Sequence, residues 1–419
     1  MQDNEKKPAL RFKGFTDPWE QRKLVELTKT ITTGKSVNSD EGEVSDGDIG
    51  VLKTSCVSYD RFNPSESKPV VKSEQQLVKC AVEKDSVIVS RMNTPERVGA
   101  CGYVSTDFPN LFLPDRLWKL KFQDTVDTYF VYMMLVSSAY KEKITSMASG
   151  TSGSMYNIPK ETFLNLQLVI PAKIDEQKQL GKILKKIDTL ITLHQRKYEK
   201  LVNIKKSMLD KMFPKNGASV PEIRFKGFTD LWEQRKLGEI AVFSKGVGYS
   251  KNDLCEEGTP IILYGRLYTK YETCIFDVDT FVKEKAGGVY SKGGEVIVPA
   301  SGETAEDISI ASVVVKPGIL LGGDLNIVSP TAEYDSAFLA LTISSGATHK
   351  YLSSLAQGKS VVHLHNADIQ SVSAKFPTKR EQEKIHLLFG KIDTLITLHQ
   401  RKLEKLQNIK KSCLEKMFV

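Results

Sequence analysis

Two stretches of the chain carry apolar residues at alternating spacings of three and four positions, one starting at Leu180 and the other at Ile385. This spacing puts apolar side chains on one face of a helix and is typical of the seam of a coiled coil. His194 and His399 interrupt the apolar pattern, and we interpret them as polar positions that set the register. The residues that we predict to form the seam are Ile183, Ile187, Leu190, Leu201, Ile204, Leu388, Ile392, Leu395, Leu406 and Ile409.

Prolines lie near the ends of both helical stretches. Pro171 and Pro377 lie upstream, and Pro214 follows the first stretch, which is where prolines usually mark a helix boundary. Each predicted helix has about thirty residues and is therefore about 45 Å long at about 1.5 Å per residue. Helices of this kind also join domains or dimerise chains, so the heptad pattern alone does not identify the architecture.

The remaining two regions, 28–170 and 238–376, contain short apolar runs separated by turn residues. The runs that we predict to be strands are Ser86–Ser90, Leu168–Ile170, Pro260–Tyr264, Glu295–Pro299 and Ile308–Val315. Longer apolar segments at Phe122–Ala139 and Asp335–Ile343 are predicted to be helical. Glycine-containing turns at Gly150–Gly153 and Gly322–Gly323 separate elements. Both regions are therefore predicted to be mixed α/β domains.

The chain also contains an internal repeat, which determines how these elements are organised. Fourteen of seventeen positions are identical between Pro8–Leu24 and Pro221–Leu237, and twenty-four of twenty-eight between Lys186–Phe213 and Lys391–Phe418. The α/β regions between these repeats show no comparable similarity. Something therefore keeps the repeated segments alike while the inserted domains differ.

This organisation predicts an α/β fold in which two α/β domains are joined by two long repeated helices. We expect the helices to pack as an antiparallel coiled coil, which would relate the halves by an internal pseudo-twofold axis. The predicted segments are a first short repeat (1–27), a first α/β domain (28–170), a central helix (171–215), a second short repeat (216–237), a second α/β domain (238–376) and a C-terminal helix (377–419).

Composition and charge change this picture only modestly. Of 419 residues, 40% are hydrophobic and 26% are charged, so the chain is an ordinary globular protein. The formal net charge of +8 suits a polyanionic partner. Six scattered cysteines match neither a zinc site nor a disulfide framework. We expect a cytoplasmic protein, because we find neither a signal-peptide core nor a stretch long enough to span a membrane.

Basic and polar residues in the turn-rich segments of both domains are candidates for DNA contact. Arginine and lysine suit guanine edges and phosphates, and asparagine suits adenine edges. Each one taken alone is better explained as a surface residue with no partner, so only the set supports DNA binding. The candidates are Lys53, Tyr59, Arg61, Arg91, Asn93, Arg97, Lys245, Tyr249, Lys251, Tyr264, Arg266 and Lys359.

No catalytic motif is convincing. The segments Gly34–Ser36 and Gly358–Ser360 resemble the end of a phosphate-binding P-loop but lack its first glycine. No methyltransferase motif is found, and His363 and His365 have no third ligand that would make them a metal site. We therefore expect a non-catalytic chain with no catalytic residues, no metal and no cofactor of its own.

The doubled PxxRFxGFxDxWEQRKL segment, the long helical repeat, and the phrases GTSGSMYNIPKETFLNLQLVIP and AQGKSVVHLHNADIQSVSAKFP resemble type I restriction–modification specificity subunits. In both halves a proline and then Glu176-Gln177 or Glu381-Gln382 open the helix. The resemblance covers essentially the whole chain and implies two target-recognition domains, each reading one half of an asymmetric bipartite site in double-stranded DNA. It also implies two methyltransferase subunits and two restriction–translocase subunits as partners. S-adenosylmethionine, ATP and Mg²⁺ would then belong to those partners.

Three alternatives stay open at this stage. The chain could serve a methylation-only system without a nuclease partner. It could be a scaffold whose coiled coil joins two protein-binding domains. It could also be a self-contained enzyme with an unrecognised active site. Salt dependence separates a DNA reader from a scaffold, because a protein with six to ten phosphate contacts loses about 10³–10⁵ in affinity between about 50 and 200 mM salt.

Overall fold

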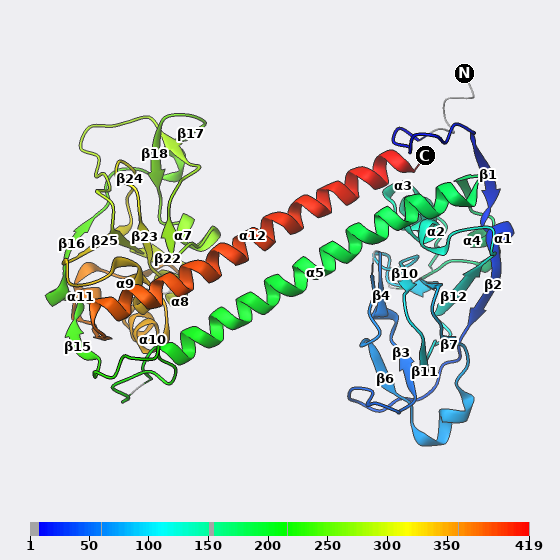
Figure 1. Cartoon of the computed structure of the whole chain (residues 1–419), viewed down its shortest axis with the longest axis horizontal. Helices are drawn as coiled ribbons and strands as arrows, with labels where there is room; N and C mark the ends of the chain where they lie inside the picture. The colour runs from blue at the N-terminus through cyan, green and yellow to red at the C-terminus, as the bar shows by residue number, and fades with distance from the viewer. Residues whose placement is uncertain (1–7, 60, 151–154, 216, 359, 419) are drawn as a thin grey trace. The chain divides into compact units, whose positions relative to one another are not determined.

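A computed structural model of the chain describes residues 8–59, 61–150, 155–215, 217–358 and 360–418 (Figure 1). The chain divides into two compact units. Unit 1 comprises Met1–Leu193 together with Lys402–Val419, and unit 2 comprises His194–Arg401. Each unit thus contains one α/β domain and a part of each long helix.

Unit 1 is built on a four-stranded antiparallel sheet, in the order β10 (Cys101–Val104), β8 (Ser86–Ser90), β12 (Leu117–Phe122), β2 (Thr28–Thr33). A second sheet has the order β6 (Ser67–Pro69), β3 (Gly50–Leu52), β11 (Phe108–Phe112), β7 (Ala81–Val82), with β3 and β11 parallel. Two-stranded pairs are β1 (Trp19–Lys23) with β14 (Gln167–Pro171), β9 (Met92–Asn93) with β13 (Tyr156–Asn157), and β4 (Val57–Ser58) with β5 (Arg61–Phe62). Its helices are α1 (Leu24–Leu27), α2 (Thr128–Leu135), α3 (Ser138–Ser146) and α4 (Lys160–Leu164), with 3₁₀ turns at Thr54–Cys56 and Lys72–Leu77.

Unit 2 repeats this plan with one more strand in the main sheet, whose order is β16 (Ala241–Lys245), β25 (Leu325–Pro330), β21 (Glu295–Pro299), β23 (Ser312–Val314), β19 (Cys274–Ile275). The second sheet has the order β17 (Leu254–Cys255), β20 (Phe281–Val282), β18 (Thr259–Ile262), β24 (Leu320–Leu321), with β18 and β24 parallel. Two-stranded pairs are β15 (Glu233–Lys236) with β27 (Ser373–Phe376), and β22 (Ser301–Gly302) with β26 (Val362–His363). Its helices are α6 (Leu237–Ile240), α7 (Arg266–Thr269), α8 (Ala305–Ile308), α9 (Ser336–Ile343), α10 (Gly346–Leu355) and α11 (Asn366–Ser371), with a 3₁₀ turn at Lys251–Asp253.

A largely apolar helix packs on the main sheet of each domain. All eight residues of α2 are buried in unit 1, and seven of the eight residues of α9 are buried in unit 2. Asp127 and Asp335 cap these helices, each accepting a hydrogen bond from the backbone N–H three residues on. A helix that is apolar on all sides is stable only when it is buried, so α2 and α9 form the centre of the two cores.

The two predicted long helices are present as α5 (Ile174–Met212) and α12 (Lys379–Met417), drawn in green and in orange to red in Figure 1. In unit 2, Nδ1 of His194 lies 2.8 Å from Nδ1 of His399, and Nζ of Lys205 lies 2.5 Å from Oδ1 of Asp393. Residue numbers rise along one helix as they fall along the other, so the two helices run antiparallel there.

The side chains shielded from solvent on these helices follow a spacing that differs from the predicted seam. In α5 the buried or half-buried residues alternate by four and three positions, and the matching residues of α12 do the same. This shielded face comprises Leu180, Leu184, Ile187, Ile191, His194, Tyr198, Leu201, Lys205, Met208 and Met212 of α5, and Ile385, Phe389, Ile392, Ile396, His399, Leu403, Leu406, Lys410, Cys413 and Met417 of α12.

Several predicted seam residues therefore need correction. Ile187, Leu201, Ile392 and Leu406 lie on the shielded face, while Leu190 and Leu388 are half-buried beside it. Four others are exposed: Ile183, Ile204, Leu395 and Ile409, by 37–43%. The reason is that apolar residues stand next to each other at positions such as Ile183 and Leu184. Two phases of the heptad then fit the sequence equally well, and only packing selects between them.

Each short repeat is fastened to the start of the long helix of its own unit by a buried ion pair. The guanidinium of Arg11 donates to both carboxylate oxygens of Glu176 at 2.6 and 2.8 Å, and Arg224 donates to Glu381 at 2.7 Å twice. The two glutamate side chains are 2% and 0% exposed. Such bidentate pairs fix geometry as well as contributing energy.

The glutamine that follows each of these glutamates fastens the α/β domain to the same helix. Gln177 accepts from the backbone N–H of Asp127 and donates to the carbonyl of Pro171. Gln382 makes the same two contacts with Asp335 and Pro377. The Glu-Gln pairs noticed in the sequence therefore join three segments in each unit.

The predicted strands and helices of the α/β domains agree with the structure to within two residues at their ends, except at two places. Ile308–Val315 is not one strand, because its first residue ends α8 and only Ser312–Val314 is extended as β23. Within Phe122–Ala139, Phe122 ends β12 and the helix begins at Thr128. In both places, apolar content alone did not reveal a break between two elements.

Candidate nucleic-acid interface

Two of the predicted arginines in unit 1 line one solvent-exposed hollow of about 380 Å³. Arg61 begins β5, and Arg97 lies in the turn after β9; both side chains are exposed. The walls also carry Ser55, Ser58, Asn63, Cys56 and Glu66. We call this group the arginine hollow. Two guanidinium groups beside hydroxyl and amide groups can contact phosphates and base edges.

One carboxylate lies in the arginine hollow, and it is engaged by neighbours other than the two arginines. Glu66 accepts a hydrogen bond from Ser55 at 2.6 Å, and the ammonium of Lys53 lies 4.0 Å away. The predicted candidate Lys53 is therefore half-buried against Glu66 and lies next to the hollow.

Three other candidates of unit 1 make intramolecular contacts. Tyr59 donates to the carbonyl of Val98 at 2.8 Å, and burial raises its pKa to about 12. Arg91 donates to the carbonyl of Asp115 and to Asn157, thereby joining two loops. Asn93 is only 8% exposed, and its side chain bonds to Ser90 and to the backbone of Thr94.

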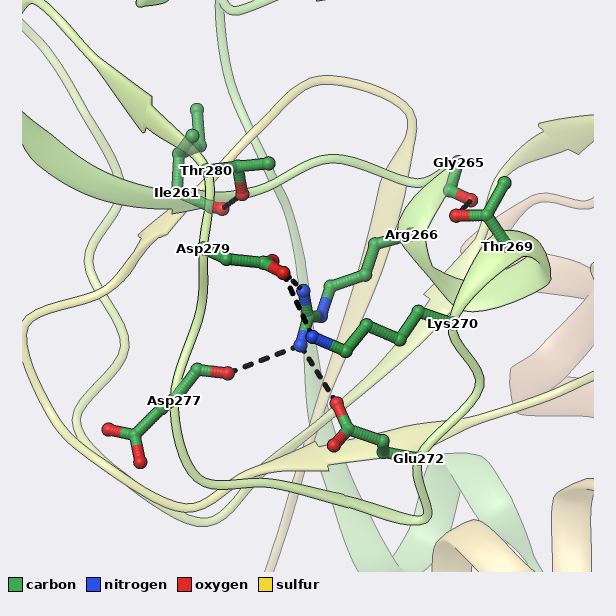
Figure 2. A network of polar contacts seen from close by, with 9 residues as sticks. All are labelled: Ile261, Gly265, Arg266, Thr269, Lys270, Glu272, Asp277, Asp279 and Thr280. Atoms are coloured by element: carbon green, nitrogen blue, oxygen red, sulfur yellow. Dashed lines mark hydrogen bonds and ion pairs between the residues drawn. The ribbon is translucent and has the colours of Figure 1, made fainter. Parts of the chain in front are cut away.

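Arg266 of unit 2 is the clearest correction, because it is buried at the centre of a polar network (Figure 2). Its guanidinium donates to Asp279 at 2.6 Å, to Glu272 at 2.8 Å and to the carbonyl of Asp277 at 3.2 Å. Lys270 bonds to the second oxygen of Asp279, and these two cations lower the pKa of Asp279 to about 2, with Lys270 the larger cause. Arg266 therefore holds together the segment after α7, and its side chain is only 7% exposed.

The tyrosines predicted in unit 2 also pack within the domain. Tyr249 is 6% exposed, and its hydroxyl accepts from the backbone N–H of Lys285 at 2.7 Å. Tyr264 is half-buried with its ring against Tyr268, at a centroid distance of 5.9 Å. Aromatic residues in turn-rich segments satisfied the sequence criterion for nucleic-acid contact, but their rings are used in the core.

Lys245 and Lys251 are the described candidates of unit 2 with exposed side chains. Lys245 ends the edge strand β16, and Lys251 begins the 3₁₀ turn that follows the loop after β16. Lys359 lies outside the described residues. Unit 2 therefore exposes lysines near the end of its edge strand. The exposed arginine candidates of unit 1 lie in the arginine hollow, which is on a different part of the domain.

The histidines His363 and His365 were set aside in the sequence as a weak metal pair, but their placement makes them candidates for contact. Both side chains are exposed, and their rings lie parallel within 4° at a centroid distance of 6.4 Å. Leu364, between them, accepts from the amide of Asn326, which is the strand partner of Lys245. The two imidazoles therefore lie at the same end of the main sheet as Lys245. The only sequence signal was their alternation along a strand.

Two of the described thiols, those of Cys56 and Cys101, are poor nucleophiles. Burial raises the pKa of Cys56, and it raises the pKa of Cys101 to about 12, so neither ionises at neutral pH. Within the described ranges, no three His, Cys, Asp or Glu side chains are grouped as metal ligands would be. In the same part of the chain, no helix has the length and apolar character needed to cross a membrane.

Comparisons with known proteins extend over both halves of the chain. Residues 16–203 and 229–408 match the type I restriction modification DNA specificity domain. The type I restriction enzyme MjaVIII specificity subunit of Methanocaldococcus jannaschii is 24% identical over 297 residues, which is 68% of each protein.

A solved structure has the same fold. The S subunit of a type I restriction–modification system from M. genitalium superposes with a TM-score of 0.67 at 16% identity, covering 99% of both chains. Two copies of the specificity domain, each ending in a long helix, agree with these matches. The chain belongs to the family of type I restriction–modification specificity subunits, the non-catalytic DNA-recognition components of these systems.

Proposed function

We propose that the chain reads an asymmetric bipartite target in double-stranded DNA, with each α/β domain acting as the target-recognition domain for one half-site. The observation that carries this proposal is that the two domains share a scaffold but expose unlike polar groups. Unit 1 offers the arginine hollow, and unit 2 offers Lys245, Lys251 and the two parallel histidines. Unlike groups on like scaffolds suit two half-sites of different sequence.

The helices would set the distance between the half-sites. Each long helix has 39 residues and is about 58 Å long at about 1.5 Å per residue. One turn of duplex DNA spans about 34–36 Å, so unread base pairs are expected between the half-sites. We propose that the antiparallel contacts of the shielded face extend as a coiled coil and keep this separation constant.

The exposed apolar residues of the helices support a docking role toward two copies of a methyltransferase subunit. Leu193 and Ile204 of α5 are exposed, as are the identical Leu398 and Ile409 of α12. Core packing explains identity between the repeats on the shielded face, but it does not explain identity at exposed positions. A partner that binds the same surface twice does explain it. Two restriction–translocase subunits would join the assembly for cleavage.

S-adenosylmethionine, ATP and Mg²⁺ are proposed to bind to those partner subunits in the cytoplasm. The sequence supports this division, because Gly34–Ser36 and Gly358–Ser360 lack the first glycine of a phosphate-binding loop. In unit 1 the glycine of this segment has another use. A Cβ at Gly34 would lie 1.5 Å from the carbonyl oxygen of Leu113, so the position requires close backbone approach.

The test is a map of N6-methyladenine in cells that express the chain with a cognate methyltransferase. We expect one split motif with two unlike halves, and replacing residues 28–170 by another first domain should change one half only. Absence of any motif from a soluble, assembled complex would contradict the proposal and favour a scaffold. As a control, exchange of the exposed Glu199 for alanine should leave the motif unchanged.

A further inference from the structure

An aspartate and a lysine from opposite helices form an ion pair in each unit, at equivalent positions of the repeat. In unit 1, Oδ1 of Asp188 lies 2.7 Å from Nζ of Lys410; in unit 2, Oδ1 of Asp393 lies 2.5 Å from Nζ of Lys205. All four side chains are largely buried, with 12–28% exposure. We call these the aspartate–lysine pairs. They place a fixed carboxylate on the side of the helix pair that faces the α/β domain.

The second oxygen of each aspartate accepts a hydrogen bond from the α/β domain. In unit 1 the donor is the hydroxyl of Tyr129, 2.5 Å from Oδ2 of Asp188. In unit 2 the donor is the hydroxyl of Thr273, 3.0 Å from Oδ2 of Asp393. Burial and the neighbouring carboxylate raise the pKa of Tyr129, so the phenol stays protonated and donates. Hydrogen bonds to a charged acceptor are among the stronger ones in proteins.

The two donors come from parts of the domain that do not correspond. Tyr129 lies on α2, and counting from the caps Asp127 and Asp335, its equivalent on α9 is Ala337, which has no hydroxyl. Thr273 directly precedes β19, the strand added at the β23 edge, whereas the four-stranded sheet of unit 1 ends at β10. Two unrelated segments therefore bring a hydroxyl to the same position of the repeated helices.

The same hydrogen bond is made by two unrelated segments. This indicates that the aspartate on the helix requires a hydroxyl donor, and that the donor is not simply a residue that the two domains share. We propose that the aspartate–lysine pairs are positioning sites, and that the hydrogen bond from Tyr129 or Thr273 fixes the orientation of each recognition domain on the helices. The pairs thereby determine which spacing between half-sites is accepted. This inference rests on the proposed function, since it concerns how the two half-sites are placed relative to each other.

The substitution Thr273→Val removes the donor and keeps the shape, while Thr273→Ser keeps the donor and is the matched control. Tyr129→Phe makes the same test in unit 1, with Tyr140→Phe as a control within the domain, because Tyr140 bonds to the backbone of Val169. Each full-length variant is assembled with the methyltransferase and given target sites whose spacer is one base pair shorter, unchanged or one base pair longer. Thermal unfolding of each assembly verifies that it is folded.

We expect Thr273→Val and Tyr129→Phe to keep both half-site sequences but to methylate the altered spacers about tenfold more, relative to the normal spacer, than the wild type does. Thr273→Ser and Tyr140→Phe should match the wild type. Equal spacer ratios for Thr273→Val and Thr273→Ser would overturn the inference. If the wild type itself yields no motif, the DNA-reading function fails. The positioning site is then tested by amide hydrogen exchange at Cys274 and Val313. Exchange should be faster in Thr273→Val than in Thr273→Ser or the wild type, and equal rates in all three would overturn the inference.

Discussion

The two α/β domains differ most in sequence and least in how they are attached. β2, β12, β8 and β10 of unit 1 occur in the same order as β16, β25, β21 and β23 of unit 2, and both second sheets contain one parallel pair. A glycine follows each edge strand closely, and a Cβ would lie 1.5 Å from a carbonyl oxygen at Gly34 and 1.9 Å at Gly246. Strand order and close backbone approach are therefore kept, while side chains elsewhere are free to change.

The comparison also separates residues that hold a domain from residues that can act for it. Arg11 with Glu176 and Arg224 with Glu381 are the same in both units because they join a short repeat to a helix. Arg61 and Lys245 have no such duty and remain exposed. Equal side chains at equal positions indicate attachment, and unlike exposed ones are candidates for recognition.

The largest expected effect is loss of a buried carboxylate at the attachment points. Glu176→Ala and Glu381→Ala each leave a buried guanidinium unpaired and should each destabilise their own unit by about 3–5 kcal/mol. The loss should be about 0.5 kcal/mol greater in unit 1, because Nε1 of Trp19 also donates to Glu176 at 3.4 Å. Amide exchange of α2 and α9 reports each unit separately. Equal protection of both helices in both variants would contradict the prediction.

A smaller effect distinguishes a buried arginine from an exposed one. Arg266→Ala removes the centre of the network in Figure 2 and should lower the stability of unit 2 by about 2–3 kcal/mol. Arg61→Ala should change stability by at most about 0.5 kcal/mol. It should weaken DNA binding and reduce the slope of log affinity against log salt by about 1. Thermal unfolding measures the stability of each variant, and DNA titration at several salt concentrations measures its affinity. Loss of DNA affinity in Arg266→Ala and loss of stability in Arg61→Ala would contradict the prediction and place recognition at Arg266.

The acid response of the two helix caps should differ. Burial raises the pKa of Asp127. Burial also acts on Asp335, but the imidazole of His386, whose Nδ1 lies 2.8 Å from Oδ1 of Asp335, and the hydrogen bond from the backbone N–H of Phe338 outweigh it and lower the pKa of Asp335. The equivalent of His386 in unit 1 is Gly181, where a Cβ would lie 2.5 Å from Oδ1 of Asp127. A carboxyl group whose pKa is lowered on folding stabilises the folded state at pH values above its unfolded-state pKa of about 3.9. This stabilisation is lost as the pH falls through the folded-state pKa. A carboxyl group whose pKa is raised on folding has the opposite effect, because its ionised form destabilises the folded state and its protonation removes that cost.

Acidification below about pH 4 should therefore destabilise unit 2, because Asp335 becomes protonated. Asp127 becomes protonated at a higher pH than Asp335, and its protonation should stabilise unit 1. His386→Ala should cost about 1 kcal/mol at pH 7, and this difference should vanish near pH 3. Chemical denaturation of the variant and the wild type across this range measures it. A constant difference at every pH would show that His386 acts by packing alone.

The smallest effect tests the phase of the helical heptads. Ile183→Gln should change the free energy of unfolding by at most about 0.5 kcal/mol, because Ile183 is exposed by 37%. The same change at the neighbouring Leu184, which is fully buried, provides the contrast. Urea denaturation of both variants compares them. If Ile183→Gln proved the more damaging, the originally predicted seam would be restored.

Much of the fold could be predicted because it depends on local patterns. Strands at Ser86–Ser90 and Glu295–Pro299, the helix after Asp335 and both long helices follow from apolar spacing and caps. The break inside Ile308–Val315 could not be predicted, because a short helix and a short strand have the same apolar content there. The choice between Ile183 and Leu184 likewise depended on what packs against the helix.

The candidate interface was harder to predict, because the same residue types serve recognition and attachment. Arginine, tyrosine and asparagine in turn-rich segments gave equal signals at Arg61 and Arg266, and burial alone separates them. Likewise, no sequence pattern showed that Lys205 and Lys410 are each paired with an aspartate of the other helix.

The sequence by itself determined the doubled architecture, the two unlike domains and the family, because repeats and periodicity are properties of the chain order. Only the tertiary structure decided which charged groups are exposed and which hydroxyl meets each aspartate. These outcomes depend on contacts between residues far apart in the chain, such as Thr273 and Asp393, for which no spacing rule exists.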